Sequence, residues 1–238
     1  MGYYGFPKYV SVAEKKAKAS RSIEKLRKKN PDIEPVIIEG RTLAKNWWGK
    51  AWNLNLESYA DYSNRIARGK SYVRSNTVLD LKIHRGKVLA LVQGSGSKPY
   101  KIEIRIDTLP SEKWEQVTEL CNHRIDSLEQ LIEGKFPEEL EVLFTDKKYG
   151  MFPSPKEIHF DCSCPDLASM CKHVAAVLYG IGARLDSNPM LFFELRDLDG
   201  HELVRKSMEQ KLESMMKNAG KKSKREIADG DISDIFGL

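Results

Sequence analysis

Three cysteines and one histidine occur close together in the sequence, in an order that suits a metal ion. Cys162 and Cys164 are separated by one residue, and six residues later Cys171 and His173 repeat that spacing. Thiolates are soft ligands that favour zinc over magnesium or calcium. Four protein ligands leave no position open for water, which is typical of a structural zinc site. The sequence therefore predicts one structural Zn²⁺ per chain, without zinc catalysis.

The spacing also restricts the local structure that brings the ligands together. Residues two apart on a strand point to the same face, so a strand over 157–164 would direct Cys162 and Cys164 to one side and His159 to the other. Residues two apart in a helix diverge by about 200°. We therefore expect Cys171 just before a helix over 174–185 and His173 in its first turn.

Asp166 is the first carboxylate after the Cys-x-Cys pair. A zinc-bound histidine commonly donates its second ring N–H to a carboxylate, and carboxylates also stabilise helix N-termini. We therefore predict that Asp166 either orients His173 or caps the helix that follows.

Two other motifs carry less chemistry. Cys121 and His123 also read Cys-x-His, but they fall inside an expected helix, so we predict Cys121 in the core and His123 at the surface. The run Arg68-Gly69-Lys70-Ser71 resembles the end of a phosphate-binding loop, but Asn64 stands where that motif needs its first glycine. No order of residues typical of a catalytic triad or dyad is present, and we expect no enzyme.

A cationic stretch over residues 62–78 is the candidate nucleic-acid-binding segment. It contains no acidic residue, and two tyrosines, Tyr62 and Tyr72, are interleaved with the cations. Cations of this kind contact phosphates, while tyrosine rings stack on bases. The alternative is a loop-to-strand connection with ordinary surface cations. The candidate residues are Arg65, Arg68, Lys70, Tyr72, Arg74 and Lys172.

The charge of the 238-residue chain is uneven. The formal net charge is +5, but residues 8–29 sum to +7, residues 202–226 to +4, and the last twelve residues to −3. The body between the basic arms is therefore mildly acidic, and the overall excess does not by itself indicate nucleic-acid binding. The chain has no apolar run near the ~20 residues of a membrane span and no signal-peptide pattern, so we expect a cytoplasmic protein.

The pattern of apolar residues predicts an α+β fold with a small antiparallel sheet and flanking helices. Strands are expected over 77–85, 87–94, 100–107 and 157–164, with 71–74 as a further candidate. Helices are expected over 11–29, 42–60, 111–133, 137–144, 174–185 and 201–217, followed by a linker over 218–230. The recurrence of Trp48, Trp52 and Leu56 at helical spacing favours core packing over a ligand platform.

The segment FDCSCPDLASMCKHVAAVLYGIG resembles a SWIM zinc finger, whose CxC and CxH ligand pairs it matches at all four positions. A softer resemblance to the stand-alone SWIM-finger proteins of bacteria and archaea covers about residues 41–200, through WWGKAW, RGKSYVR and VQGSGSKPY. The resemblance implies a ββα zinc unit that binds nucleic acid or protein, and we expect DNA before RNA as the nucleic acid. It also implies that the protein is an accessory to a chromatin-remodelling-type DNA translocase.

Together these observations predict four regions. They are a basic helical arm over 1–40, an α+β domain over 41–150, a SWIM zinc unit over 151–200, and a helical, partly disordered tail over 201–238. The first function hypothesis is a non-enzymatic nucleic-acid-binding module. The second is a protein–protein adaptor with a purely structural zinc site, docked through the zinc unit and the acidic, apolar C-terminal end. A continuous basic face would favour the first, and an exposed apolar patch the second.

Overall fold

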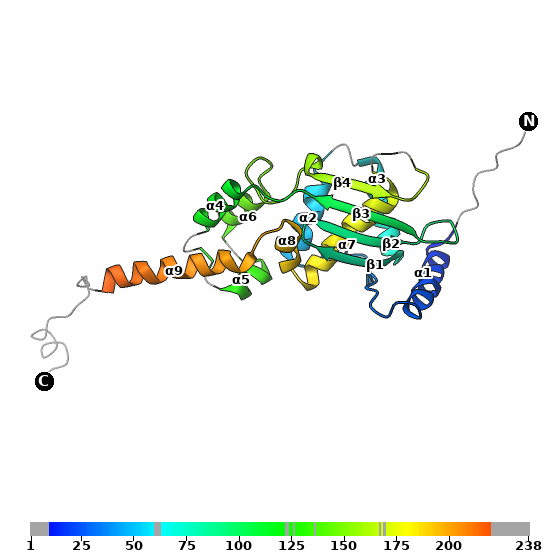
Figure 1. Ribbon diagram of the computed structural model, residues 1–238, viewed down its shortest axis with the longest axis horizontal. Coiled ribbons are helices and arrows are strands. Elements are labelled where there is room, and N and C mark those ends of the chain that lie inside the picture. The colour runs from blue at the N-terminus through cyan, green and yellow to red at the C-terminus, as the bar shows by residue number, and fades with distance from the viewer. Residues whose placement is uncertain are drawn as a thin grey trace, which may run out of the picture.

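The computed structural model describes residues 10–59, 63–121, 124–125, 127–135, 137–166, 168 and 170–219. A four-stranded antiparallel sheet lies against a layer of helices, and a long C-terminal helix extends away from both (Figure 1). The expected α+β class is confirmed. No helix within the described ranges is both long and apolar enough to span a lipid bilayer.

The sheet has the strand order β1 (Val78–His84), β2 (Lys87–Val92), β3 (Tyr100–Ile106) and β4 (Ile158–Cys162). The first three strands form the expected meander, and a tight turn at Gly86, with φ of 63°, joins β1 to β2. β4 arrives from about fifty residues further along and pairs with β3, so that Cys162 lies opposite Ile102. The predicted zinc ligand Cys162, at the end of β4, is thereby attached to the main sheet.

The expectation of a strand over 71–74 is wrong, because these residues end helix α3 (Ser63–Arg74). Ile66 and Val73, seven residues apart, share one face of that helix, and Val73 is fully buried. Gly69 allows α3 to approach helix α7 (Lys172–Ser187) closely, because a Cβ at Gly69 would lie 2.5 Å from the Cβ of Ala175. The glycine therefore serves helix packing and not a phosphate-binding loop.

Helix α7 is the centre of the molecule. It contacts all four strands on one side and packs against α2 (Trp47–Glu57) and α3 on the other. The indole N–H groups of the fully buried Trp48 and Trp52 donate to the carbonyl oxygens of Leu131 and Leu178, at 2.8 Å each. The prediction that these tryptophans pack in the core is confirmed.

Helix α1 (Val12–Arg27) lies apart from this main core. Ser11 and Glu14 form a capping box at its start. Its buried Ala19 and Ile23 pack with Ile33 and with Leu79 of β1 in a small second cluster. The basic arm is thus docked on the sheet through a few apolar contacts.

The helix expected over 111–133 is two helices, α4 (Ser111–Leu120) and α5 (Leu128–Glu133). The hydroxyl of Ser127 accepts a hydrogen bond from the N–H of Gln130 at 3.1 Å and so starts a new helix. The remaining elements are α6 (Glu138–Thr145), a 3₁₀ turn (Pro155–Glu157), α8 (Met190–Leu195) and α9 (Gly200–Ala219). Tyr62, His123 and residues 220–238 lie outside the described residues; the last range holds most of the expected linker and half of the expected tail.

One apolar core joins the regions expected as 41–150 and 151–200. Its buried residues come from α2, the sheet, α4 to α8 and the start of α9. The partner of β4 in the expected zinc unit is β3, from the preceding region. The two ranges therefore share both a sheet and a core.

Candidate metal centre

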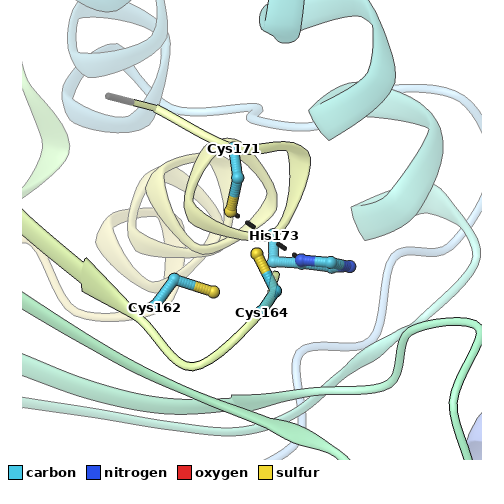
Figure 2. A group of neighbouring side chains, drawn as sticks. All are labelled: Cys162, Cys164, Cys171 and His173. Atoms are coloured by element: carbon cyan, nitrogen blue, oxygen red, sulfur yellow. Dashed lines mark hydrogen bonds between the residues drawn. The ribbon is translucent and has the colours of Figure 1, made fainter. Parts of the chain in front are cut away.

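Strand β4 and helix α7 bring the four predicted ligands together (Figure 2). Cys162 ends β4, Cys164 follows two residues later, Cys171 is the N-cap of α7, and His173 lies in the first turn of that helix. Their ligand atoms all lie within 4.8 Å of one another. The predicted arrangement at the end of a strand and the start of a helix is confirmed.

The expected exclusion of His159 is also confirmed. Its side chain is half exposed on the other face of β4, with Nε2 2.9 Å from a carboxylate oxygen of Asp107. Cys121 is fully buried in the apolar core, where burial raises the pKa of its thiol to about 12. Within the described residues, therefore, only one group of cysteines and histidine converges.

The geometry of the group fits zinc. Tetrahedral coordination with Zn–S bonds near 2.3 Å and Zn–N bonds near 2.0 Å places ligand atoms about 3.5–3.8 Å apart. The Sγ of Cys171 lies 3.7 Å from the Nδ1 of His173, so Nδ1 is the ring nitrogen that faces the sulfurs (Figure 2). Cys171 and His173 are almost fully buried, while Cys162 and Cys164 are half-buried. The protein binds zinc through this Cys3His set.

The start of helix α7 favours a thiolate. A hydrogen bond from Cys162, together with contacts to His173 and the N–H of Val174, holds the pKa of the Cys171 thiol well below its usual range. The same contact with Cys171, reinforced by burial, raises the pKa of Cys162. A bound Zn²⁺ would supply the positive charge that keeps all three cysteines in the thiolate form.

Aromatic rings enclose His173, which reasoning from the sequence did not anticipate. The ring of Tyr100 on β3 lies 4.6 Å from the imidazole and that of Tyr72 on α3 lies 5.4 Å away, measured between centroids. Gly94, in the loop between β2 and β3, approaches both Tyr100 and His173. In the sequence, the run VQGSGSKPY is the signal that could have indicated this enclosure, because it places two glycines near Tyr100.

Asp166 differs from its predicted role. Its carboxylate accepts from the N–H of Ala168 at 3.2 Å and pairs with the guanidinium of Arg65 at 3.5 Å. The N-cap of α7 is Cys171, and no described protein group accepts a hydrogen bond from the Nε2 of His173. Asp166 therefore links the segment that follows Cys164 to α3. It neither orients His173 nor caps α7.

The predicted nucleic-acid-binding residues divide into paired and unpaired cations. Arg65 pairs with Asp166, Lys70 pairs with Glu57 at 2.8 Å, and Arg74 donates to the carbonyl oxygen of Arg41. Arg68 and Lys172 have no carboxylate partner among the described residues. Five of the six candidates lie on α3 and Lys172 begins α7, so the loop-to-strand connection considered as the alternative is a helix instead.

Tyr72 is the point where cations from three helices meet. The Nζ of Lys172 on α7 lies 5.8 Å from its ring centroid, and that of Lys15 on α1 lies 5.9 Å away. Arg68 precedes Tyr72 by four residues on α3 and is close enough to lower the pKa of Tyr72, although burial, the larger effect, raises it. One turn of α3 therefore gathers cations beside the metal centre.

Residues 160–180 match the family model described as the SWIM zinc finger. All four ligands fall inside the matched range. The chain contains a SWIM zinc finger. The expected ββα unit consists here of β3, β4 and α7, because the second strand comes from far upstream.

The likeness to a known protein extends beyond the SWIM finger. An uncharacterized protein of Mycobacterium tuberculosis is 34% identical over 183 residues, which is 73% of this chain and 66% of that protein. The chain therefore spans just under two thirds of that relative. No solved structure matches the chain significantly.

Proposed function

We propose that this SWIM-finger protein is a non-enzymatic nucleic-acid-binding module, with DNA as the preferred ligand. The observation that carries the proposal is the meeting of Lys15, Arg68 and Lys172 around Tyr72. Lys15 lies on α1 in the basic arm, Arg68 lies on α3, and Lys172 lies in the SWIM finger. Phosphate contacts by such cations supply most of the sequence-independent affinity for nucleic acids.

The absence of competing carboxylates supports this assignment. Lys15, Arg68 and Lys172 have no ion pair within the described ranges, whereas Arg65 and Lys70 are each neutralised by an acidic residue. An unpaired cation is available to a phosphate without first breaking a salt bridge. The proposed contact residues are therefore Arg68 and Lys172, which the sequence suggested, and Lys15 of α1, which it did not.

Zinc has a positioning role in this proposal. With three thiolates and one imidazole, no coordination position is left for a substrate or a catalytic water. Lys172 lies between the two ligands Cys171 and His173, so zinc fixes the backbone from which Lys172 reaches Tyr72. The metal thus holds a cation in place and takes no part in a reaction.

Fluorescence anisotropy with the full chain tests the proposal. The probes are labelled single-stranded DNA, duplex DNA and RNA, each titrated at several salt concentrations. Reversing three cations, in the variant Lys15→Glu with Arg68→Glu and Lys172→Glu, is expected to weaken binding. Loss of three phosphate contacts should reduce the log–log salt slope by about 2 to 3 units, since each contact contributes about 0.9 on duplex and 0.7 on single strands.

A charge-matched variant separates the proposed face from general basicity. Lys50→Glu with Lys101→Glu and Arg105→Glu changes the net charge equally, at exposed positions on α2 and on the other face of the sheet. This variant is expected to keep most of the affinity. Equal weakening in both variants would show that binding follows net charge alone and would remove the assignment to the Tyr72 face.

A specific observation favours the adaptor hypothesis as a second candidate. Helix α9 exposes Met208, Leu212 and Met215, which with Leu128 of α5 line a groove of about 710 Å³. Exposed apolar surface of this kind is typical of protein interaction sites. The test is a titration with a purified chromatin-remodelling-type DNA translocase. Binding that is lost in Leu212→Glu and is insensitive to salt would support the adaptor function.

A further inference from the structure

We propose that Gly94, held in its loop by Lys18 of α1, positions the zinc ligand His173 and so governs how long the metal is retained. The loop lies against the imidazole on the side away from the sulfurs, and Lys18 fixes the loop. The basic N-terminal helix is then part of the metal centre, although it supplies no ligand.

The first argument concerns what holds the imidazole. Metal-bound histidines nearly always anchor their second ring nitrogen by a hydrogen bond. The Nε2 of His173 is buried and has no hydrogen-bond acceptor among the described protein groups. The ring is held instead by packing, between Tyr100 at 4.6 Å with planes tilted by 41° and Tyr72 at 5.4 Å edge to face.

Gly94 closes this enclosure. A Cβ at Gly94 would lie 2.3 Å from a ring carbon of Tyr100 and 3.1 Å from the Nε2 of His173. The first distance is below any real carbon contact, so a methyl group there would displace Tyr100, the loop or the imidazole. Gly96, two residues later, offers a matched contrast, because its nearest atom would be 3.7 Å away, in ordinary contact.

Lys18 fixes the position of the loop. Its Nζ donates to the carbonyl oxygens of Gly94, Ser95 and Gly96, at 3.1, 2.9 and 2.9 Å. The side-chain amide of Gln93 donates to two of the same oxygens. A charged donor with three acceptors is a strong tether, since hydrogen bonds to charged groups are worth more than neutral ones. Through this tether, α1 holds Gly94 against the imidazole.

The rate of zinc release tests the glycine. The full-length, zinc-loaded protein is mixed with an excess of a chromogenic chelator, and wild type is compared with Gly94→Ala and Gly96→Ala. Residues that support a ligand typically change metal affinity by about 10- to 100-fold, so release from Gly94→Ala is expected to be at least about tenfold faster. Gly96→Ala should release zinc at the wild-type rate. Equal rates in Gly94→Ala and wild type would overturn the proposal.

Two variants of α1 test the tether. Lys18→Met removes the three hydrogen bonds but keeps the aliphatic stem, while Lys25→Met removes an exposed cation from the same helix. Lys18→Met alone is expected to accelerate zinc release, and this result also carries the test if Gly94→Ala does not fold. The visible spectrum of the Co²⁺-substituted protein, which reports ligand geometry, should change in Lys18→Met and not in Lys25→Met. Identical release rates and spectra in the two lysine variants would overturn the proposal.

Discussion

Arg196 is the most deeply buried charge in the described part of the chain, with 1% of its side chain exposed. One guanidinium nitrogen donates to the carbonyl oxygen of Asp107 at 2.7 Å, and another to the carboxylate of Glu157 at 2.8 Å. The arginine thus joins the end of α8 to the segments that flank β3 and β4. A buried ion pair of this kind is costly to break from one side, because the remaining polar groups lose their partners.

Arg196→Met is therefore expected to lower the free energy of unfolding by about 3 kcal/mol. The measurement is equilibrium urea unfolding at neutral pH of the zinc-loaded protein. Arg105→Met, on the exposed face of β3, is the matched control and should change stability by less than about 0.5 kcal/mol. A cost as small as that of the control would mean that the arginine is dispensable for holding the three segments together.

At the scale of residues, the zinc ligands could be predicted because their spacing leaves few ways to converge. Cys162 had to lie on a strand and Cys171 just before a helix, and both do. The partners of Asp166 and Lys70 could not be predicted, because Arg65 and Glu57 reach them only after helices α2 and α3 have packed on α7. Tertiary contacts, not local pattern, decide which cations remain unpaired.

At the scale of elements, the start of α2 depends on α7. The side chain of Asn46 accepts from the N–H of Gly49 at 2.9 Å and donates to the carbonyl oxygens of Leu185 and Asp186. The Asp186 carboxylate in turn accepts from the backbone N–H groups of Lys45 and Asn46. These contacts explain why the helix expected from residue 42 begins at Trp47.

Asn46→Ala is expected to cost about 1–2 kcal/mol of unfolding free energy, at the upper part of the range for helix N-caps, because it also breaks the link to α7. Ser127→Ala, which removes the purely local cap of α5, should cost less, about 1 kcal/mol or below. Urea midpoints of the two variants provide the comparison. The reverse order would show that the contacts between Asn46 and α7 contribute little.

The strands of the meander could be predicted because their alternation matches one buried face. The helical structure of residues 71–74 could not be predicted, since four residues fit both a helical and a strand periodicity. The close approach of α3 to α7 at Gly69 decides between the two. The break between α4 and α5 was missed for a related reason. Apolar residues continue across it, and the cap at Ser127 is a weaker signal than that periodicity.

At the scale of the molecule, zinc ties the edge of the sheet to the central helix. Structural zinc contributes about 10–16 kcal/mol of apparent binding energy in finger peptides, which acts as folding energy. Cys164 follows β4 and caps no helix, so its replacement removes a ligand and little else. Cys164→Ser is expected to lose zinc, as measured by metal content, whereas Cys121→Ala should retain it.

The thermal unfolding of the metal-free protein then shows whether the zinc finger and the rest of the molecule unfold together. Because α7 contacts all four strands, α2 and α3, we expect zinc removal to lower the temperature of a single unfolding transition. A small early transition followed by an unchanged main one would instead indicate a finger that folds separately from the rest. Circular dichroism at a helix-sensitive wavelength, with and without chelator, makes the distinction.

The four tryptophans give the protein an internal optical reporter. All lie outside the metal centre, on α2 and α4, and the indoles of Trp48 and Trp52 are shielded completely from water with their N–H groups bonded. The rings that pack on the zinc ligand His173 in the described part of the chain belong to Tyr72 and Tyr100 instead. Tryptophan emission, shifted to the blue by the apolar surroundings, should therefore stay constant while zinc leaves an intact core and move to the red only when that core opens. Intrinsic fluorescence can thus time metal release and unfolding separately in one sample, without an added label.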